Sequence, residues 1–268
     1  MGQFAMIGSG AAIRPMIAFG AAAILLAGAS LLPRPAKAGP PFRTDDPEPV
    51  DYQHYEFYTF FTGTHISDDT SGVGPAWEFN YGLIPNGQFH IVAPLAFDDP
   101  AGGSSQFGYG DTELGFKYRF IQEDDKGSRP MVGVFPLVEL PTGDQGSGLG
   151  AGHVRVYLPV WVQKSFGDWT TYGGGGYWIN HGGGTLDQDY WFVGWLLQKQ
   201  VTKQLAVGGE VFHQTADTMG GKGSTGFNIG AVYDLDDHNH LLVSAGTGVQ
   251  NASDTNLYSW YVGYQITN

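Results

Sequence analysis

The 268-residue sequence contains no cysteine, so disulfide bonds do not stabilise its fold. Charged residues are scarce, at 15% of the chain, and the 13 lysines and arginines are outnumbered by 26 aspartates and glutamates. The formal net charge of −13 argues against nucleic acid as a partner, because no basic patch is available to neutralise phosphates. Such a chain needs another source of stability, such as a large core or a closed, hydrogen-bonded barrel.

The longest apolar run lies near the beginning of the chain. Arg14 is followed by "PMIAFGAAAILLAGASLL", then by the short polar stretch "PRPAKA" and Gly39. A positive charge, an apolar stretch and Ala36-x-Ala38 ahead of the junction predict a cleavable secretory signal peptide over residues 1–38. A transmembrane anchor is the alternative, but a run rich in alanine and glycine with a cleavage site directly after it favours the signal.

Removal of the signal leaves a mature chain that starts at Gly39 and carries a formal charge of about −16, because three basic residues and no acidic ones are lost. Its length of about 230 residues fits one all-β domain. No later stretch reaches the roughly 18 apolar residues of a membrane-spanning helix. We therefore expect a location outside the inner membrane, and strands wherever the chain crosses a bilayer.

Beyond Gly39 the sequence alternates with a period of two, in segments of about ten residues separated by turn-forming clusters. Segments of this length cross a bilayer when they are tilted. About twelve strands are predicted, an even number that is typical of bacterial outer-membrane barrels. The expected strands are Tyr52–Thr62, Pro75–Leu83, Gln88–Phe97, Gly108–Gln122, Pro130–Leu140, Ala151–Lys164, Trp169–Asn180, Asp189–Lys199, Gln204–Thr215, Thr225–Asp234, His240–Val249 and Leu257–Ile266.

The connections between these segments fall into two classes. The odd ones are long and rich in glycine, serine and aspartate, as in "GTHISDDTSGVG" and "PTGDQGSGLG", whereas the even ones, such as "IPNG" and "VTKQ", are mostly short. Long extracellular loops alternating with short periplasmic turns are typical of an outer-membrane barrel, whereas a soluble sandwich has no reason to alternate in this way. We therefore predict an all-β, closed antiparallel transmembrane β-barrel over residues 52–268, with both termini periplasmic and residues 39–51 forming a periplasmic N-terminal segment.

The stretch "GYGDTELGFKYRF", Gly108 to Phe120, illustrates the two faces of a strand. Leu114 and Phe116 belong to an apolar, aromatic face, and Lys117 and Arg119 belong to a charged face. In a soluble protein the apolar face would be the core. In a barrel the assignment inverts, so that the apolar face meets lipid and the charged face points into the lumen.

This stretch and "FPLVELPTGD" (Phe135–Asp144) resemble the outer-membrane transporter family named for the MetA pathway of phenol degradation. In that family a glycine-aspartate opens a strand that ends in a Lys-Tyr-Arg-Phe-like element, and the next strand ends in a Pro-Thr-Gly turn. The resemblance covers most of the mature chain, from about Arg43 to Ile266. It implies an outer-membrane β-barrel that passes small, often aromatic or apolar compounds, and it brings no catalytic residues.

Charged side chains that point into a barrel must pair across strands or be wetted by lumen water, because unpaired buried charges are costly. Such a network can be a salt-bridged closed lumen that rigidifies the barrel, or a constriction whose charges select what passes. Aromatic inward residues, Tyr157, Trp161, Tyr172, Trp178 and Phe212, provide an adhesive path for hydrophobic solutes or simply fill space. The candidate pore-lining residues are Glu56, Glu78, Asp111, Glu113, Lys117, Arg119, Glu139, Arg155 and Glu210.

Three features of the sequence are typical of catalytic or metal sites, but each has a simpler explanation. "HGGG" at His181–Gly184 matches an oxyanion loop of lipases, but the Gly-x-Ser-x-Gly elbow that this loop needs is missing, so a flexible extracellular loop is the better interpretation. "DLDDHNH", Asp234 to His240, lies in a predicted periplasmic turn, where such residues are ordinary. His90, His153 and His213 have no evident serine and acid partners in sequence. We expect no enzyme, cofactor or bound metal.

The sequence therefore predicts an outer-membrane channel for passive passage of small molecules, aromatic or apolar ones included. Its expected partners are outer-membrane lipid and lipopolysaccharide, the small-molecule solute and the barrel-assembly machinery. A structural or surface-interaction barrel with a closed lumen is the main alternative. A lipid-acting outer-membrane enzyme is the third.

Overall fold

The computed structural model describes residues 39–124, 128–182 and 186–268, so the predicted signal peptide and the last two glycines of "HGGG" lie outside the described residues. Strands dominate this part of the chain, and one four-residue α-helix, α1 (Ala252–Thr255), and one 3₁₀ turn, η1 (Gln145–Ser147), are its helical elements. No helix among the described residues is both long and apolar enough to span a membrane. The strands are β1 (Tyr55–His65), β2 (Asp69–Ile84), β3 (Gly87–Pro100), β4 (Gln106–Tyr109), β5 (Thr112–Ile121), β6 (Met131–Val134), β7 (Leu137–Leu140), β8 (Arg155–Phe166), β9 (Trp169–Ile179), β10 (Tyr190–Gln200), β11 (Leu205–Gln214), β12 (Ser224–Asp234), β13 (Asn239–Gln250) and β14 (Tyr258–Thr267).

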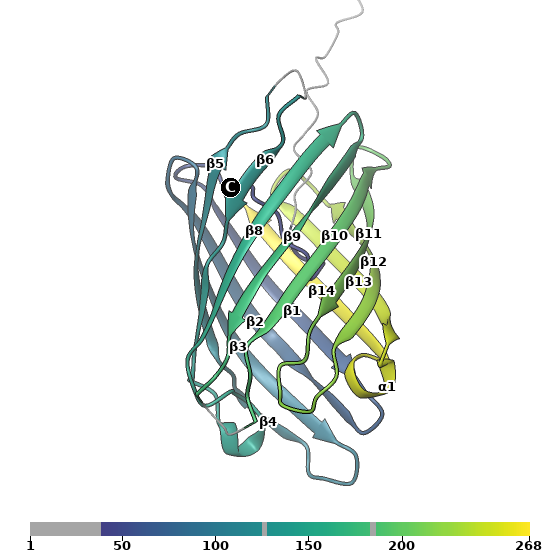
Figure 1. The fold of residues 1–268 in the computed structure, drawn as a ribbon. Coiled ribbons are helices and arrows are strands. Elements are labelled where there is room, and N and C mark those ends of the chain that lie inside the picture. Colours follow the sequence, from purple (N-terminus) through teal and green to yellow (C-terminus); the bar gives the residue numbers. More distant parts are fainter. Residues whose placement is uncertain (1–38, 125–127, 183–185) are drawn as a thin grey trace, which may run out of the picture. The chain divides into compact units, whose positions relative to one another are not determined.

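These strands form one antiparallel sheet that closes on itself (Figure 1). Successive strands of the wall are paired, with β4 and β5 acting as one strand and β6 and β7 as another, and β1 closes the barrel by pairing with β14 from Glu56↔Thr267 to His65↔Tyr258. Closure gives each spanning strand two hydrogen-bonded neighbours, which satisfies its backbone N–H and C=O groups without water. The predicted closed antiparallel barrel is confirmed.

Two of the predicted strands are each divided into two segments. β4 and β5 together replace the expected strand over residues 108–122, and β6 and β7 replace the one over residues 130–140, so the fourteen segments make a barrel of twelve strands. The second break falls at Phe135–Pro136, where proline has no N–H to give to the ladder. At the first break, Gly110 and Thr112 donate their backbone N–H groups to Pro94 O and Thr142 Oγ1 outside the ladder.

The two ends of the barrel differ, as the alternation of the connections predicts. One end, here called the turn end, carries both the C-terminus and the mostly short connections 85–86, 122–130, 167–168, 201–204 and 235–238 (Figure 1, top). The other, the loop end, carries the connections 66–68, 101–105, 141–154, 180–189, 215–223 and 251–257, with η1 and α1. The first loop is shorter than expected, because β1 and β2 remain paired as far as His65↔Thr70. The serines, threonines and glycines of this stretch do not prevent the backbones of β1 and β2 from pairing there.

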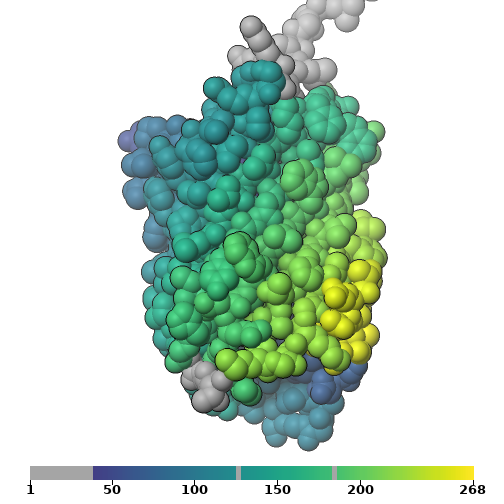
Figure 2. Space-filling model, viewed as in Figure 1, coloured from purple at the N-terminus to yellow at the C-terminus, as the bar shows by residue number. Residues whose placement is uncertain are grey.

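Exposed apolar side chains lie on the outer face of most strands, and the face seen in Figure 2, which carries β8 to β11, is closed by packed side chains. Leu158, Val193 and Ile229 lie near the middle of their strands and are exposed. Many exposed aromatic side chains lie toward the strand ends, as expected for the two girdles of a membrane barrel, whereas Phe61, Trp77 and Trp195 lie nearer the middle of their strands. Exposed aromatic residues of the loop end are Phe107, Tyr109, Trp191 and Tyr258, and those of the turn end are Phe120, Phe166, Trp169, Tyr233 and Tyr264.

Replacing Ile229, whose side chain is exposed at the middle of β12, by arginine would place a charge at the centre of this apolar belt. We expect the variant to lose about 2–4 kcal/mol of folding free energy in lipid vesicles, against about 0–1 kcal/mol for Val249→Arg near the loop end. Denaturant titration in vesicles measures both. Equal losses would mean that the belt does not face lipid.

Candidate functional site

The lumen of the barrel holds the segment that precedes the first strand. Residues 39–51, expected in the periplasm, are instead folded inside the barrel, where Thr44 and Asp46 are 0% and 1% exposed. Glycines of the wall make room for the segment, since a Cβ at Gly194 would lie 2.1 Å from Thr44 Oγ1. Backbone and charged groups of the segment find partners on the inner face of the wall, which sequence periodicity does not predict.

Glu210, on β11, is the main anchor of this segment. Its Oε1 accepts the backbone N–H of Arg43 at 2.9 Å, and its Oε2 accepts that of Thr44 at 2.8 Å. The amide of Asn228, on the adjacent β12, also donates to Oε1 at 2.6 Å. The carboxylate is 2% exposed, so these charge-assisted bonds compensate a charge that water does not reach.

Ion pairs from β5 hold the middle of the segment. Lys117 Nζ lies 2.9 Å from Asp45 Oδ1 and 3.6 Å from Asp46 Oδ1. Arg119 Nη1 lies 3.7 Å from Glu48 Oε1, so the two cations of "KYR" pair with the segment rather than across the strands. The sequence signal that could have revealed this was the run of charges from Arg43 to Glu48, just ahead of the first strand.

A chain of hydrogen bonds crosses the inner face of β2, β3 and β5. The amide of Asn80 donates to Glu78 Oε1 at 2.7 Å, and its Oδ1 lies 2.7 Å from His90 Nδ1. His90 Nε2 is 2.8 Å from Glu113 Oε1. Glu78 and Glu113 were named separately from the sequence, and the structure joins them through a buried histidine and an asparagine between them.

The remaining candidate residues have other roles. Glu56 accepts a hydrogen bond from the hydroxyl of Tyr58 at 2.7 Å. Glu139 forms an ion pair with Arg155 across the β7–β8 ladder. Asp111 accepts the backbone N–H groups of Gly143 and Ala151 at 2.9 and 2.6 Å, so its carboxylate braces the 141–154 loop.

Aromatic side chains fill much of the space between these polar groups. One buried cluster combines Phe135, Tyr157, Trp161, Phe192 and Phe212. A second combines Tyr58, Phe60, Val232, Leu242 and Tyr261 with Ala76. The lumen is therefore lined by both ion pairs and rings.

Three histidines considered for catalysis have no serine partner among the described residues. His153 Nε2 is 2.8 Å from the carbonyl oxygen of Asn180, and His213 Nδ1 is 2.8 Å from Thr225 Oγ1. His90 contacts Asn80 and Glu113, as above. None of the three thus forms the serine–histidine pair that a lipid hydrolase needs.

The turn "DLDDHNH" has a structural explanation. Asp236 Oδ1 accepts the backbone N–H groups of His238 and Asn239 at 2.8 and 3.0 Å. These bonds lower the pKa of Asp236, because they stabilise its ionised form. Among the described residues, no group of three or more acidic or histidine side chains has an arrangement suited to a metal ion.

The comparisons with known proteins agree with this geometry. A family model described as "Putative MetA-pathway of phenol degradation" matches residues 39–265, which include the segment in the lumen and nearly all of the barrel. The chain belongs to this family. The resemblance inferred from the two short motifs is therefore confirmed. No curated protein matches the chain in sequence.

Solved structures with the same architecture are outer-membrane barrels. The COG4313 outer membrane channel of Pseudomonas putida aligns with a TM-score of 0.69 at 14% identity, over 87% of this chain and 100% of that one. The NanC porin aligns with a TM-score of 0.55 at 9% identity, over 79% and 98% of the two chains. The KdgM porin gives 0.51 at 11% identity, over 78% and 98%. At these identities the likeness concerns the fold.

The anchoring role of Glu210 can be measured with one introduced thiol, because the chain has no cysteine. A Thr44→Cys variant should react slowly with a charged maleimide, since this position is 0% exposed. Adding Glu210→Ala should raise the rate about tenfold or more, because the loss of charged hydrogen bonds releases the segment.

Glu56→Ala is the matched control, because Glu56 is an inward carboxylate that bonds Tyr58 instead of the segment. It should leave the labelling rate of Thr44→Cys unchanged, and Ser105→Cys in the loop should label quickly in every background. Identical rates with and without Glu210 would show that the carboxylate does not hold the segment.

Proposed function

We propose that this protein is an outer-membrane channel for passive passage of small molecules through its barrel. The observation that carries the proposal is the lumen itself. It is occupied by a segment of the chain held only by hydrogen bonds, ion pairs and packing. Such contacts can exchange for contacts with a solute while the hydrogen-bonded ladder of the wall stays intact.

The two faces of the barrel support this proposal. The outer face is apolar and bears aromatic girdles, as a lipid-embedded wall requires. The inner face carries charges of both signs, which suit a wetted path with some selectivity. The chain would reach its membrane through cleavage of the signal over residues 1–38 and insertion by the barrel-assembly machinery. It would there contact lipid and lipopolysaccharide.

The competing proposal is a structural barrel whose lumen stays closed. The ion pairs of Lys117 and Arg119 with the segment favour it, because they also rigidify the interior. The two proposals differ in one measurable property, which is the passage of solutes through the folded barrel.

The mature chain, inserted into planar bilayers, should give discrete conductance steps, and proteoliposomes containing it should take up small solutes. A variant lacking residues 39–50 should conduct more than the full chain, because the segment then no longer occupies the lumen. If the full chain neither conducts nor admits solute while the shortened one does, the protein is a structural barrel whose lumen stays closed.

The charges on β5 should set ion selectivity. Glu113→Gln removes a negative charge from the inner face and should move the reversal potential in a salt gradient toward anion permeation. Arg119→Gln removes a positive charge and should move it the opposite way. Lys222→Gln, in the 215–223 loop, should leave it unchanged. Shifts of the same sign for the first two variants would exclude a path past these residues.

A further inference from the structure

Gly39, the first residue after the predicted cleavage site, is buried beside two carboxylates of its own segment. A Cβ at this glycine would lie 3.7 Å from Asp45 Oδ1 and 3.9 Å from Asp46 Oδ2. The backbone nitrogen of Gly39 is bonded to the same Cα atom at about 1.5 Å, so it lies in the same neighbourhood. In the uncleaved chain this nitrogen belongs to the peptide bond with Ala38 and carries no charge.

The two oxygens of the Asp46 carboxylate differ in their surroundings. Oδ1 accepts the backbone N–H of Glu48 and lies 3.6 Å from Lys117 Nζ. Oδ2 is buried and has no hydrogen-bond partner among the described residues, in a side chain that is 1% exposed. A carboxylate oxygen without water or a donor is costly, so this oxygen is an unfilled acceptor beside Gly39.

Asp45 and Asp46 also share one cation between them. Lys117 Nζ lies 2.9 Å from Asp45 Oδ1, in addition to its contact with Asp46. Within the described part of the chain, no second lysine or arginine lies within ion-pair distance of either carboxylate. Two negative charges against one positive charge leave an uncompensated charge in a confined space.

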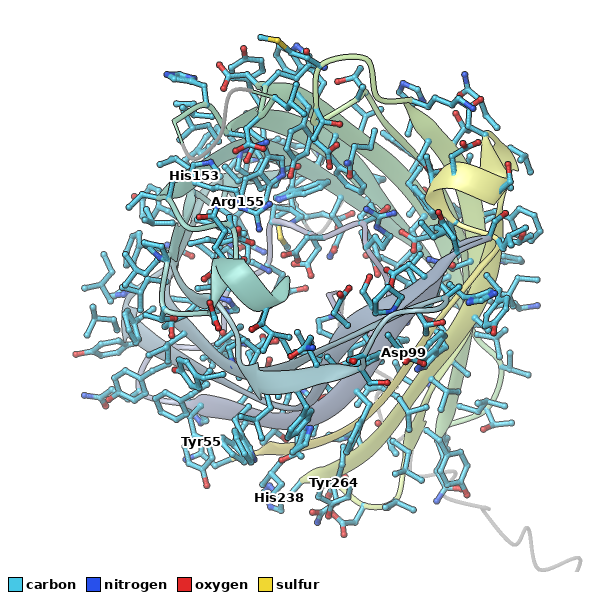
Figure 3. The ribbon with its side chains drawn as sticks, turned by 90° about the horizontal axis from the view of Figure 1, so that it is seen from below. Tyr55, Asp99, His153, Arg155, His238 and Tyr264 are labelled. Atoms are coloured by element: carbon cyan, nitrogen blue, oxygen red, sulfur yellow. The ribbon has the colours of Figure 1, made fainter. Side chains whose placement is uncertain are left out.

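The other inward-pointing cations have partners elsewhere. Arg155 points into the lumen in the view from the loop end (Figure 3), where it pairs with Glu139. Arg119 pairs with Glu48, and the guanidinium of Arg43 donates to an amide oxygen of the wall. A second cation for the two aspartates has to come from outside this set.

We propose that the α-ammonium group created at Gly39 by cleavage of the signal forms a buried ion pair with Asp46, so that processing fixes the beginning of residues 39–51 in the lumen. A signal peptidase adds water across the Ala38–Gly39 bond. The new carboxylate leaves on Ala38, and the amine that remains on Gly39 takes up a proton. The inference rests on the proposed cleavage and is independent of conduction.

The product of cleavage suits this site better than the precursor does. The ammonium brings a positive charge and three N–H donors, whereas the peptide nitrogen of the precursor has one uncharged N–H. With Lys117, it balances the charges of Asp45 and Asp46. A terminal amine is also no longer held by residue 38, so it can turn toward Asp46 Oδ2.

Two chains that differ by one residue test where the ammonium has to lie. One starts at Gly39 and the other at Ala38, and both are folded into detergent micelles with Thr44→Cys as the buried label site. We expect a charged maleimide to react about tenfold or more faster with the longer chain, because its ammonium is displaced from Asp46. Near-ultraviolet circular dichroism checks that both barrels fold.

Asp46→Asn separates the ion pair from the space that an extra residue takes. The substitution keeps the shape of the side chain and removes its charge, so the two chains should then label at rates within about twofold of each other. Asp51→Asn, at an exposed carboxylate of the same segment, is the matched control and should preserve the full difference.

Equal rates for the two unaltered chains, or a difference that persists in Asp46→Asn, would overturn the proposal. So would a first residue other than Gly39 in the exported protein, as read by intact mass spectrometry. Labelling does not require conduction, so this proposal and the channel fail separately. Coupling between the chain start and Asp46 without conductance would contradict the channel alone, and conductance without this coupling would contradict the ion pair alone.

Discussion

The pairing of β1 with β14 is the constraint on which the rest of the structure depends. It joins the two ends of the sheet, so that no strand edge faces the apolar surroundings with unpaired N–H or C=O groups. Without cysteines, this closed ladder replaces the disulfides that stabilise many exported proteins. Where the ladder is interrupted, at Gly110 and at Pro136, the backbone hydrogen bonds go to neighbouring segments instead.

Closure also divides the side chains into two populations with opposite requirements. Those on the outer face are apolar because they meet lipid, and those on the inner face include charges that must find partners in a confined space. Residues 39–51 supply many of these partners: Glu210 binds the segment backbone, and Lys117 and Arg119 bind its carboxylates. The inner charges therefore fix the position of the segment that precedes the first strand.

The same arrangement brings Arg43 to two buried aromatic rings of the inner face. The guanidinium reaches Phe212 and Phe192 because Glu210 holds the backbone of the same residue on β11.

Much of the barrel could be predicted from the sequence because its physical signals are local. Side chains alternate with a period of two along a strand, so Tyr118 and Phe120 could be assigned outward and Lys117 and Arg119 inward. The lengths of the connections indicated which end carries the loops. The broken strands were missed, because a single proline or glycine also occurs in continuous edge strands and bulges.

The candidate site could be predicted only in part. The sequence by itself determined which residues face inward, since that follows from alternation alone, and it therefore named Glu210, Arg155 and Trp178. The tertiary structure decided which of them meet. Glu210 contacts Thr44 across 166 positions of sequence, and Tyr157 stacks on Trp178 because strand register aligns them. Such contacts depend on register, closure and the path of residues 39–51, which are properties of the whole chain.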